Sequence, residues 1–174
     1  MKNLKKFLCL GLCLTTLFGS VLTSDAATVS GTYPTRRGTI LVTSDAYKNL
    51  IPTGHAAIVW DSSTVVESIS SGVVVGRNNW TSNKKKIYGV SVSSTTAAQD
   101  SSVASWCRSQ VGKSYNYNYL NVTTRKKFYC SQLVWAGYRD LYGIDLNTST
   151  FGKAIHPMEL VNSSQTYTFY TYKK

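Results

Sequence analysis

Hydrophobic and polar residues alternate in short runs over much of this 174-residue chain, a pattern typical of β-strands. Runs rich in β-branched and aromatic residues predict strands at Thr39–Thr43, His55–Trp60, Thr64–Ile69, Val73–Val75, Ile87–Val92 and Thr166–Tyr172. The turn-forming residues Asp61-Ser62-Ser63 connect the second and third of these runs, which are therefore predicted to form a hairpin. The pattern therefore predicts a sheet built largely from neighbouring antiparallel strands.

A first stretch with helical periodicity covers Ala97–Val111 and ends at Gly112. Thr95 or Thr96 precedes it and suits the N-cap position, because a hydroxyl oxygen there accepts an unsatisfied backbone N–H. Cys107 lies on the apolar face of this predicted helix. We therefore expect Cys107 to be a core residue.

The second helical stretch begins at Cys130. Apolar residues recur at helical spacing up to Tyr142, and Gly143 follows, where a helix often ends in a residue with positive φ. A thiol at the start of a helix lies beside unsatisfied N–H groups and the positive end of the dipole. This environment lowers its pKa and favours the nucleophilic thiolate. The stretch alone is equally compatible with Cys130 as a small buried hydrophobe.

The order of elements is strands, two helices and a final strand, which predicts an α+β fold with a mainly antiparallel sheet packed against a few helices. We expect a single domain over residues 39–174, preceded by a loose polar leader over residues 27–38. Ser44–Gly54 is expected to be a loop or a helical turn.

Residues 1–26 have the features of a secretion signal. Three lysines occur among the first six residues, Phe7–Leu22 is mostly apolar, and Ser24-Asp25-Ala26 offers small residues for cleavage. Polar residues interrupt the apolar stretch, so a membrane span is the weaker interpretation. We expect a secreted or envelope-associated protein that is cleaved near Ala26.

The formal net charge is +11 at pH 7, and it becomes +9 when Lys2, Lys5, Lys6 and Asp25 are removed with the signal. A strongly basic secreted domain is attracted to polyanions. The short cluster Lys84–Lys86, like a second one at Arg125–Lys127, lacks the interleaved aromatic residues of a nucleic-acid module. We expect a monomer whose solvated basic loops favour an anionic wall polymer or membrane surface, with no specific nucleic acid.

A thiolate nucleophile needs a base and a group that orients the base. His55 opens one predicted strand, and Glu67 lies on the next. Side chains alternate between the faces of a strand, so the length of the connecting loop decides whether the two residues meet. A loop with an odd number of residues pairs Ala57 with Glu67 and places Glu67 on the same side as His55. A loop of even length places them on opposite faces.

His55 and Glu67 each have a structural alternative to a catalytic role. His55 has the alternative role of a core histidine bonded to backbone, and Glu67 that of a partly exposed strand carboxylate. His156 is a rival base, but Pro157 favours an extended surface segment there. The candidate ligands lack any close-spaced pair, so we expect neither a metal nor another cofactor.

Several segments together resemble the permuted NlpC-type cysteine hydrolases, the YiiX-like branch of the papain-like fold. They are Gly54–Val59, Val66–Ser68, Val111–Asn116, Tyr129–Trp135 and Pro157–Leu160. The resemblance covers about Thr39 to Val161, and its most specific motif is Tyr-Cys-Ser-Gln-Leu-Val-Trp. The order histidine, acid, cysteine is that of the permuted members, whereas in papain the cysteine precedes the histidine.

The resemblance implies Cys130 as nucleophile, His55 as general base and acid, and Glu67 as the residue that orients the imidazole. The Cys130 backbone N–H at a helix start is a suitable oxyanion donor. Tyr129, or a residue of the Tyr115–Tyr119 loop, is a candidate for a second donor. Members of the family hydrolyse or transfer acyl groups at amide bonds, often in peptidoglycan peptides, and some act on lipids.

Three hypotheses of function follow. The first is a secreted cysteine amidase or peptidase that cleaves an amide of peptidoglycan peptides or another envelope component through an acyl-enzyme. The second is an acyltransferase or lipid amidase of the same fold. The third is a basic, non-catalytic envelope-binding protein. The presence of Cys130, His55 and Glu67 together disfavours the third hypothesis.

Overall fold

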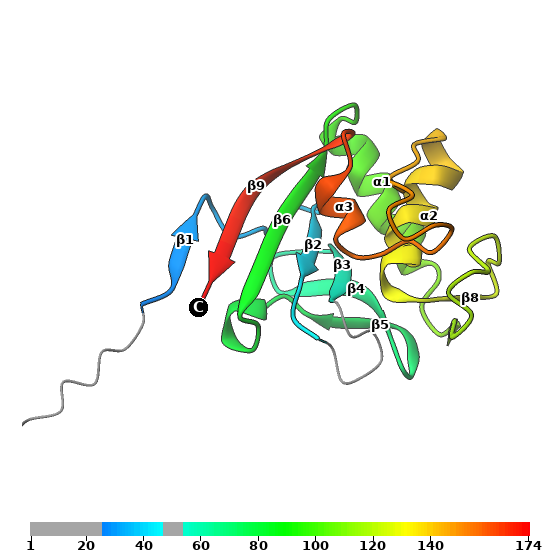
Figure 1. Ribbon diagram of the computed structural model, residues 1–174, viewed down its shortest axis with the longest axis horizontal. Helices are drawn as coiled ribbons and strands as arrows, with labels where there is room; N and C mark the ends of the chain where they lie inside the picture. The colour runs from blue at the N-terminus through cyan, green and yellow to red at the C-terminus, as the bar shows by residue number, and fades with distance from the viewer. Residues whose placement is uncertain (1–25, 47–53) are drawn as a thin grey trace, which may run out of the picture.

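The computed structural model describes residues 26–46 and 54–174. The expected signal and most of the loop expected at Ser44–Gly54 lie outside these residues. A seven-stranded sheet has the order β1-β9-β6-β2-β3-β4-β5, and every pairing in it is antiparallel (Figure 1). Its strands are β1 Thr28–Ser30, β2 Ile40–Thr43, β3 His55–Val59, β4 Thr64–Ile69, β5 Gly72–Arg77, β6 Lys86–Val92 and β9 Thr166–Lys173.

The remaining elements are a short parallel ribbon and four helices. They are β7 Ser114–Tyr115, β8 Lys127–Phe128, the 3-10 helix η1 Trp80–Ser82, α1 Ala97–Arg108, α2 Cys130–Tyr142 and α3 Glu159–Asn162. The predicted α+β class with a mainly antiparallel sheet is confirmed. Within the part of the chain that the structure describes, no helix combines the length and the apolar character needed to cross a membrane.

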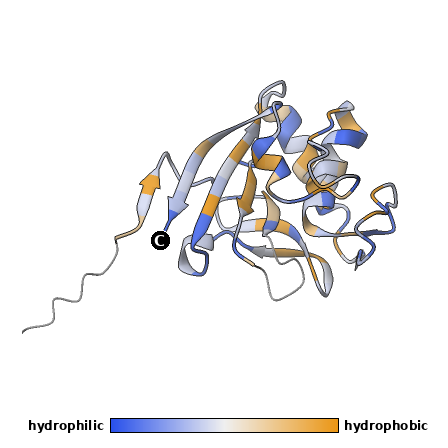
Figure 2. Ribbon diagram, viewed as in Figure 1, coloured by the Kyte–Doolittle hydropathy of each residue, from blue (hydrophilic) through white to orange (hydrophobic). Residues whose placement is uncertain are grey.

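Each face of the sheet carries its own core. On one face, alternate residues of β2, β3 and β6 pack with the buried sides of α1 and α2. Strand β2 is almost entirely hydrophobic in sequence, whereas β9, which lies between β1 and β6, is largely hydrophilic (Figure 2). The smaller core on the other face consists of Leu41, Ala57, Val59, Val65, Trp80, Ile87 and Tyr170. His55 belongs to this second face, because it alternates in phase with Ala57 and Val59.

Helix α1 has the N-cap predicted by its sequence but ends earlier than predicted. Thr96 caps it, with its hydroxyl accepting the Gln99 N–H at 3.3 Å. The helix stops at Arg108, and Val111 lies beyond it with 45% of its surface exposed. Cys107 is completely buried, as predicted, and its thiol donates to the Leu133 carbonyl at 3.6 Å.

Residues 27–38 are more ordered than the loose leader that their polar composition indicated. Strand β1 pairs with the end of β9 and so satisfies backbone groups that the edge of the sheet would otherwise expose. Arg36 forms an ion pair of 2.8 Å with the buried carboxylate of Asp100 on α1. A buried carboxylate needs such a partner, and sequence spacing does not reveal a contact across 64 residues.

Candidate active site

Helix α2 begins at Cys130, as predicted. Tyr129 is the N-cap residue with an extended backbone, and Gly143 ends the helix with φ 68°, a left-handed conformation that glycine adopts without steric cost. The Cys130 side chain therefore lies in the first turn, beside N–H groups that have no partner within the helix. Only 1% of the Cys130 surface is exposed.

The β3–β4 hairpin has the register that the odd-length loop predicts. Ala57 pairs with Glu67, so His55 and Glu67 lie diagonally on the same face. The His55 Nε2–H donates to the Glu67 Oε2 at 2.6 Å. The imidazole is 2% exposed and the Glu67 side chain 14% exposed. The prediction that these two residues meet is confirmed.

The thiol of Cys130 hydrogen bonds to the imidazole of His55. Since Glu67 occupies Nε2, Nδ1 is the ring nitrogen left for the sulfur. The backbone N–H groups of Ala56 and Ser131 also donate to the sulfur. Ala56 is the second residue of β3 and lies one residue before the Ala57–Glu67 pair, so the first turn of α2 meets the beginning of β3.

The electrostatics of the pair favour a thiolate and an imidazolium. Burial raises the pKa of the Cys130 thiol, but the hydrogen bond and charge of His55 and the two backbone donors outweigh it, so that pKa lies below its ordinary value. Burial lowers the pKa of His55, but Cys130 and Glu67 outweigh it and raise that pKa. Cys107 has no such partners, and burial alone raises the pKa of its thiol.

Trp80 covers the His55 ring, and sequence reasoning missed it. The two ring centroids are 5.6 Å apart with an interplanar angle of 30°, and Trp80 is 3% exposed. The Tyr33 hydroxyl fixes the start of η1. It accepts the backbone N–H of Trp80 at 3.1 Å and donates to Asn78 Oδ1 at 2.9 Å. By excluding water from the imidazole, the indole strengthens the hydrogen bond between His55 and Glu67.

Gly76 on β5 leaves the space that the Glu67 carboxylate occupies. A Cβ at residue 76 would lie 1.9 Å from Glu67 Oε1 and 2.9 Å from its Cδ. No side chain fits there unless Glu67 moves. Gly76 is therefore part of the geometry that directs the carboxylate toward His55.

We expect Gly76→Ala to displace the Glu67 carboxylate and to weaken its bond to His55. Because that bond is one of the interactions that raise the pKa of His55, the pKa should fall. The measurement is an NMR titration of the His55 imidazole, with Val75→Thr as the control at an exposed position on the same strand. A His55 pKa that is unchanged in Gly76→Ala would refute this role for Gly76.

The first turn of α2 is fixed by polar contacts around Cys130. The buried Gln132 amide donates to the Val122 carbonyl at 3.1 Å and accepts from Asn116 Nδ2 at 2.9 Å. The Ser131 hydroxyl donates to the Ile155 carbonyl at 2.6 Å. Ser131 and Gln132 belong to the motif Tyr-Cys-Ser-Gln-Leu-Val-Trp. Their hydrogen-bond partners lie in loops distant in the sequence and were not predicted.

The charge of Cys130 raises the pKa of two of the tyrosine candidates for a second oxyanion donor, Tyr129 and Tyr115. The Tyr129 hydroxyl accepts the Ile155 N–H at 2.8 Å and donates to the Tyr119 carbonyl at 3.3 Å, so its proton is engaged. Tyr115 is 6% exposed, and burial raises the pKa of its phenol, as does the neighbouring charge of Cys130. Its hydroxyl hydrogen bonds to the Tyr119 side chain, so both phenols are neutral O–H groups with a partner, and both remain candidates.

His156, the rival base, occupies a different setting. It is half-buried, stacks on Phe151 with ring centroids 4.2 Å apart, and accepts the Met158 N–H on Nδ1 at 3.2 Å. Burial lowers its pKa. The imidazole that contacts Cys130 and Glu67 is that of His55.

Residues 40–169 match a profile of the family described as permuted papain-like amidase enzymes, YaeF/YiiX, C92 family. The match covers most of the chain, and the chain belongs to this family. The resemblance seen in the sequence is thereby confirmed, as is the permuted papain-like fold.

Two individual proteins are similar to the chain. The uncharacterized protein YycO of Bacillus subtilis (strain 168) is 30% identical over 126 residues, which are 68% of this chain and 49% of YycO. The chain thus spans about half the length of this curated relative. The crystal structure of metalloprotein yiiX from Escherichia coli O157:H7 matches with a TM-score of 0.60 and 16% identity, covering 77% of this chain and 96% of that one.

The likeness to yiiX concerns the fold. Among residues 26–46 and 54–174 of the present chain, no three side chains of histidine, cysteine, aspartate or glutamate are grouped closely enough to hold a metal ion. Among the described residues, Cys107 and Cys130 are both free thiols.

Proposed function

We propose that this protein is a secreted cysteine amidase or peptidase that cleaves an amide bond of the cell envelope through a Cys130 acyl-enzyme. The observation that supports it best is the hydrogen-bonded series Cys130–His55–Glu67, with the sulfur at the start of α2. Membership of an amidase family supports the reaction class. In this proposal Cys130 is the nucleophile, His55 the general base and acid, and Glu67 the group that orients the imidazole.

In the acylation step, the Cys130 thiolate attacks the carbonyl carbon of the amide and forms a C–S bond. The oxyanion of the tetrahedral intermediate accepts hydrogen bonds from the Cys130 backbone N–H and, as further candidates, from the hydroxyl of Tyr115 or Tyr129. The imidazolium of His55 then donates its proton to the leaving nitrogen, and the C–N bond breaks. A thioester on Cys130 and a free amine result.

In the deacylation step, neutral His55 accepts a proton from a water molecule that attacks the thioester carbon. The C–S bond breaks, the carboxylic acid product leaves, and the thiolate–imidazolium pair forms again. Glu67 holds the ring through Nε2 in both steps, so Nδ1 stays directed at the reacting atoms.

The envelope location and the peptide substrate are supported by the charge and by the signal features at the N-terminus. The +9 formal charge that remains without the signal favours residence among the anionic polymers of a cell wall. Peptidoglycan peptides carry many amide bonds in that setting. We therefore propose them as the first substrate class to examine.

The experiment is a digest of purified peptidoglycan and, in parallel, of N-acyl and ester lipids, with products identified by mass spectrometry. We expect new amine and carboxylate ends in the peptidoglycan peptides. Release or transfer of an acyl chain from the lipids would instead favour the acyltransferase or lipid amidase. Binding to the wall without any product from either substrate would contradict the enzymatic proposal.

A further inference from the structure

Two basic segments that are far apart in the sequence meet at one end of the sheet. The register of β6 and β9 places Lys86 opposite Lys173, and the Lys174 N–H donates to the Lys85 carbonyl at 2.8 Å. The end of β9 therefore lies beside the loop that leads into β6 (Figure 1). At this place the sequence indicated the cluster Lys84–Lys86, and the fold adds Lys173 of β9 and Lys174, which follows it.

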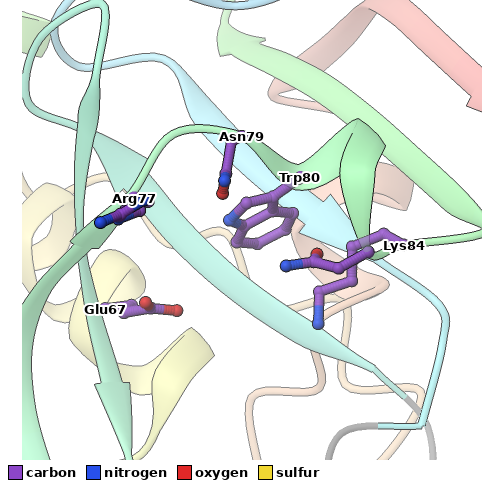
Figure 3. A pocket seen from close by; sticks show the side chains of 6 residues that line it. Glu67, Arg77, Asn79, Trp80 and Lys84 are labelled. Atoms are coloured by element: carbon purple, nitrogen blue, oxygen red, sulfur yellow. The ribbon is translucent and has the colours of Figure 1, made fainter.

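Part of this basic surface is hollowed. A first hollow of about 230 Å³ is lined by Glu67, Arg77 and Lys84, among others (Figure 3). A second, of about 370 Å³, is lined by Lys84, Lys85 and Lys174. Both are lined by Asn83 and Lys84, so they adjoin each other. We define the basic groove as these two hollows.

The groove combines four cations with neutral hydrogen-bond donors. Arg77, Lys84, Lys85 and Lys174 supply the positive charge. The exposed amide and hydroxyl side chains that line the groove with them are those of Asn79, Thr81, Ser82 and Asn83. Two acidic side chains lie against these residues. Glu67 lines the first hollow, and Asp45 accepts the backbone N–H of Lys85. The cations outnumber the carboxylates, and N–H and O–H donors beside cations suit phosphate oxygens.

The surroundings of the groove argue against nucleic acid and against a membrane. Trp80 is the aromatic residue that lines it, but its ring is 3% exposed and covers His55, so it offers no open face for a stacked base. The large hydrophobic side chains that are exposed elsewhere among the described residues do not line it, whereas a membrane-inserting face needs such residues. A flexible anionic chain without bases fits a polar, positively charged groove best.

We propose that the basic groove binds a linear chain of phosphodiester groups that carries no bases, such as a polyol phosphate. Successive phosphates would lie along Lys174, Lys85, Lys84 and Arg77. One end of the groove is then formed by Glu67 and Trp80, the two residues that support the His55 ring. This inference goes beyond the proposed function and does not depend on it, because binding is measured without turnover.

The test is titration calorimetry of the protein with poly(glycerol phosphate) at low and at physiological ionic strength. We expect binding that weakens as salt rises, since condensed counterions are released from the polymer. Removing two cations of the groove in Lys85→Gln/Lys174→Gln should weaken binding about fivefold per lysine. The salt dependence should become shallower in the same variant.

The matched control is Lys86→Gln/Lys173→Gln, which removes the same charge at the same end of the sheet but outside the groove. The side chains of Lys86 and Lys173 line a separate hollow with Tyr88 and Thr171. At physiological ionic strength, where screening acts over about 8 Å, we expect this control to lose no more than about twofold, because its two lysines line a different hollow. Unchanged melting temperatures would show that both variants are folded.

Three results would overturn the proposal. An equal loss in the two double variants would show that diffuse charge, and not the groove, binds the polymer. Tighter binding of phosphatidylglycerol vesicles or of a single-stranded oligonucleotide, at equal phosphate concentration and through Lys85 and Lys174, would show that the partner belongs to another class. Failure to bind poly(glycerol phosphate) at low salt would overturn the proposal directly. None of these results bears on whether Cys130 cleaves an amide.

Discussion

Replacing Cys130 by serine is expected to lower kcat/KM for amide cleavage by roughly 10⁴-fold or more, because a nucleophile and its base act as one unit. Serine preserves the shape of the side chain, but its hydroxyl has a far higher pKa than a thiol. His55 and the backbone donors of Ala56 and Ser131 can hold a thiolate but not an alkoxide. The measurement is kcat/KM on the substrate identified in the digest, together with mass spectrometry of the trapped acyl-enzyme.

The control for this prediction is Cys107→Ala. Cys107 is the second free thiol of the described chain, and it is buried in the core between α1 and α2. We expect Cys107→Ala to retain its activity within about twofold and to lose some stability, because a sulfur is removed from a packed interior. Activity that survives in Cys130→Ser, or that is lost only in Cys107→Ala, would contradict the assignment of Cys130.

Replacing His55 by alanine is expected to lower kcat/KM by roughly 10² to 10⁴-fold, the range for the loss of a general acid–base group. The change also removes the interaction that counteracts burial at Cys130, so the pKa of the thiol should rise. The loss of activity should therefore be largest near neutral pH and smaller in alkaline solution, where the thiol ionises without help. The measurement is the pH profile of kcat/KM for the protein and the variant.

His156→Ala is the matched control, because His156 is the other histidine of the chain and packs against Phe151 outside the Cys130–His55–Glu67 series. It should leave the pH profile unchanged. The double variant Cys130→Ser/His55→Ala should be no worse than Cys130→Ser, since either change disables the same pair. Additive losses would show that His55 acts separately from Cys130.

Those parts of the site that depend on local rules were predictable from the sequence. Helix periodicity and Gly143 located both ends of α2, and the parity of a three-residue turn placed Glu67 on the same face as His55. The burial of Cys107 followed from its position on an apolar face. In each case the deciding interactions lie within one element or between two consecutive strands.

Those parts that depend on long-range packing were not predictable. Trp80 lies 25 residues from His55, at the start of the 3-10 helix η1, and only the folded chain brings the two rings together. Gly76 shows its role only when the position of the Glu67 carboxylate is known. The backbone hydrogen bond between Lys174 and Lys85 forms between neighbouring segments of the sheet. The ion pair between Arg36 and Asp100 joins the N-terminal segment to α1. Sequence periodicity carries no information on such contacts.

The measurement that tests the account most directly is an ultraviolet titration of the Cys130 thiolate. The absorbance of the protein minus that of Cys130→Ser reports this one sulfur, without regard to its access to reagents. If Cys130 is the activated nucleophile, its thiol ionises below the ordinary pKa of about 8.5. The pKa of Cys130 then rises in His55→Ala. Ionisation at or above the ordinary value, unchanged by His55→Ala, would contradict the account and leave Cys130 as a buried structural residue.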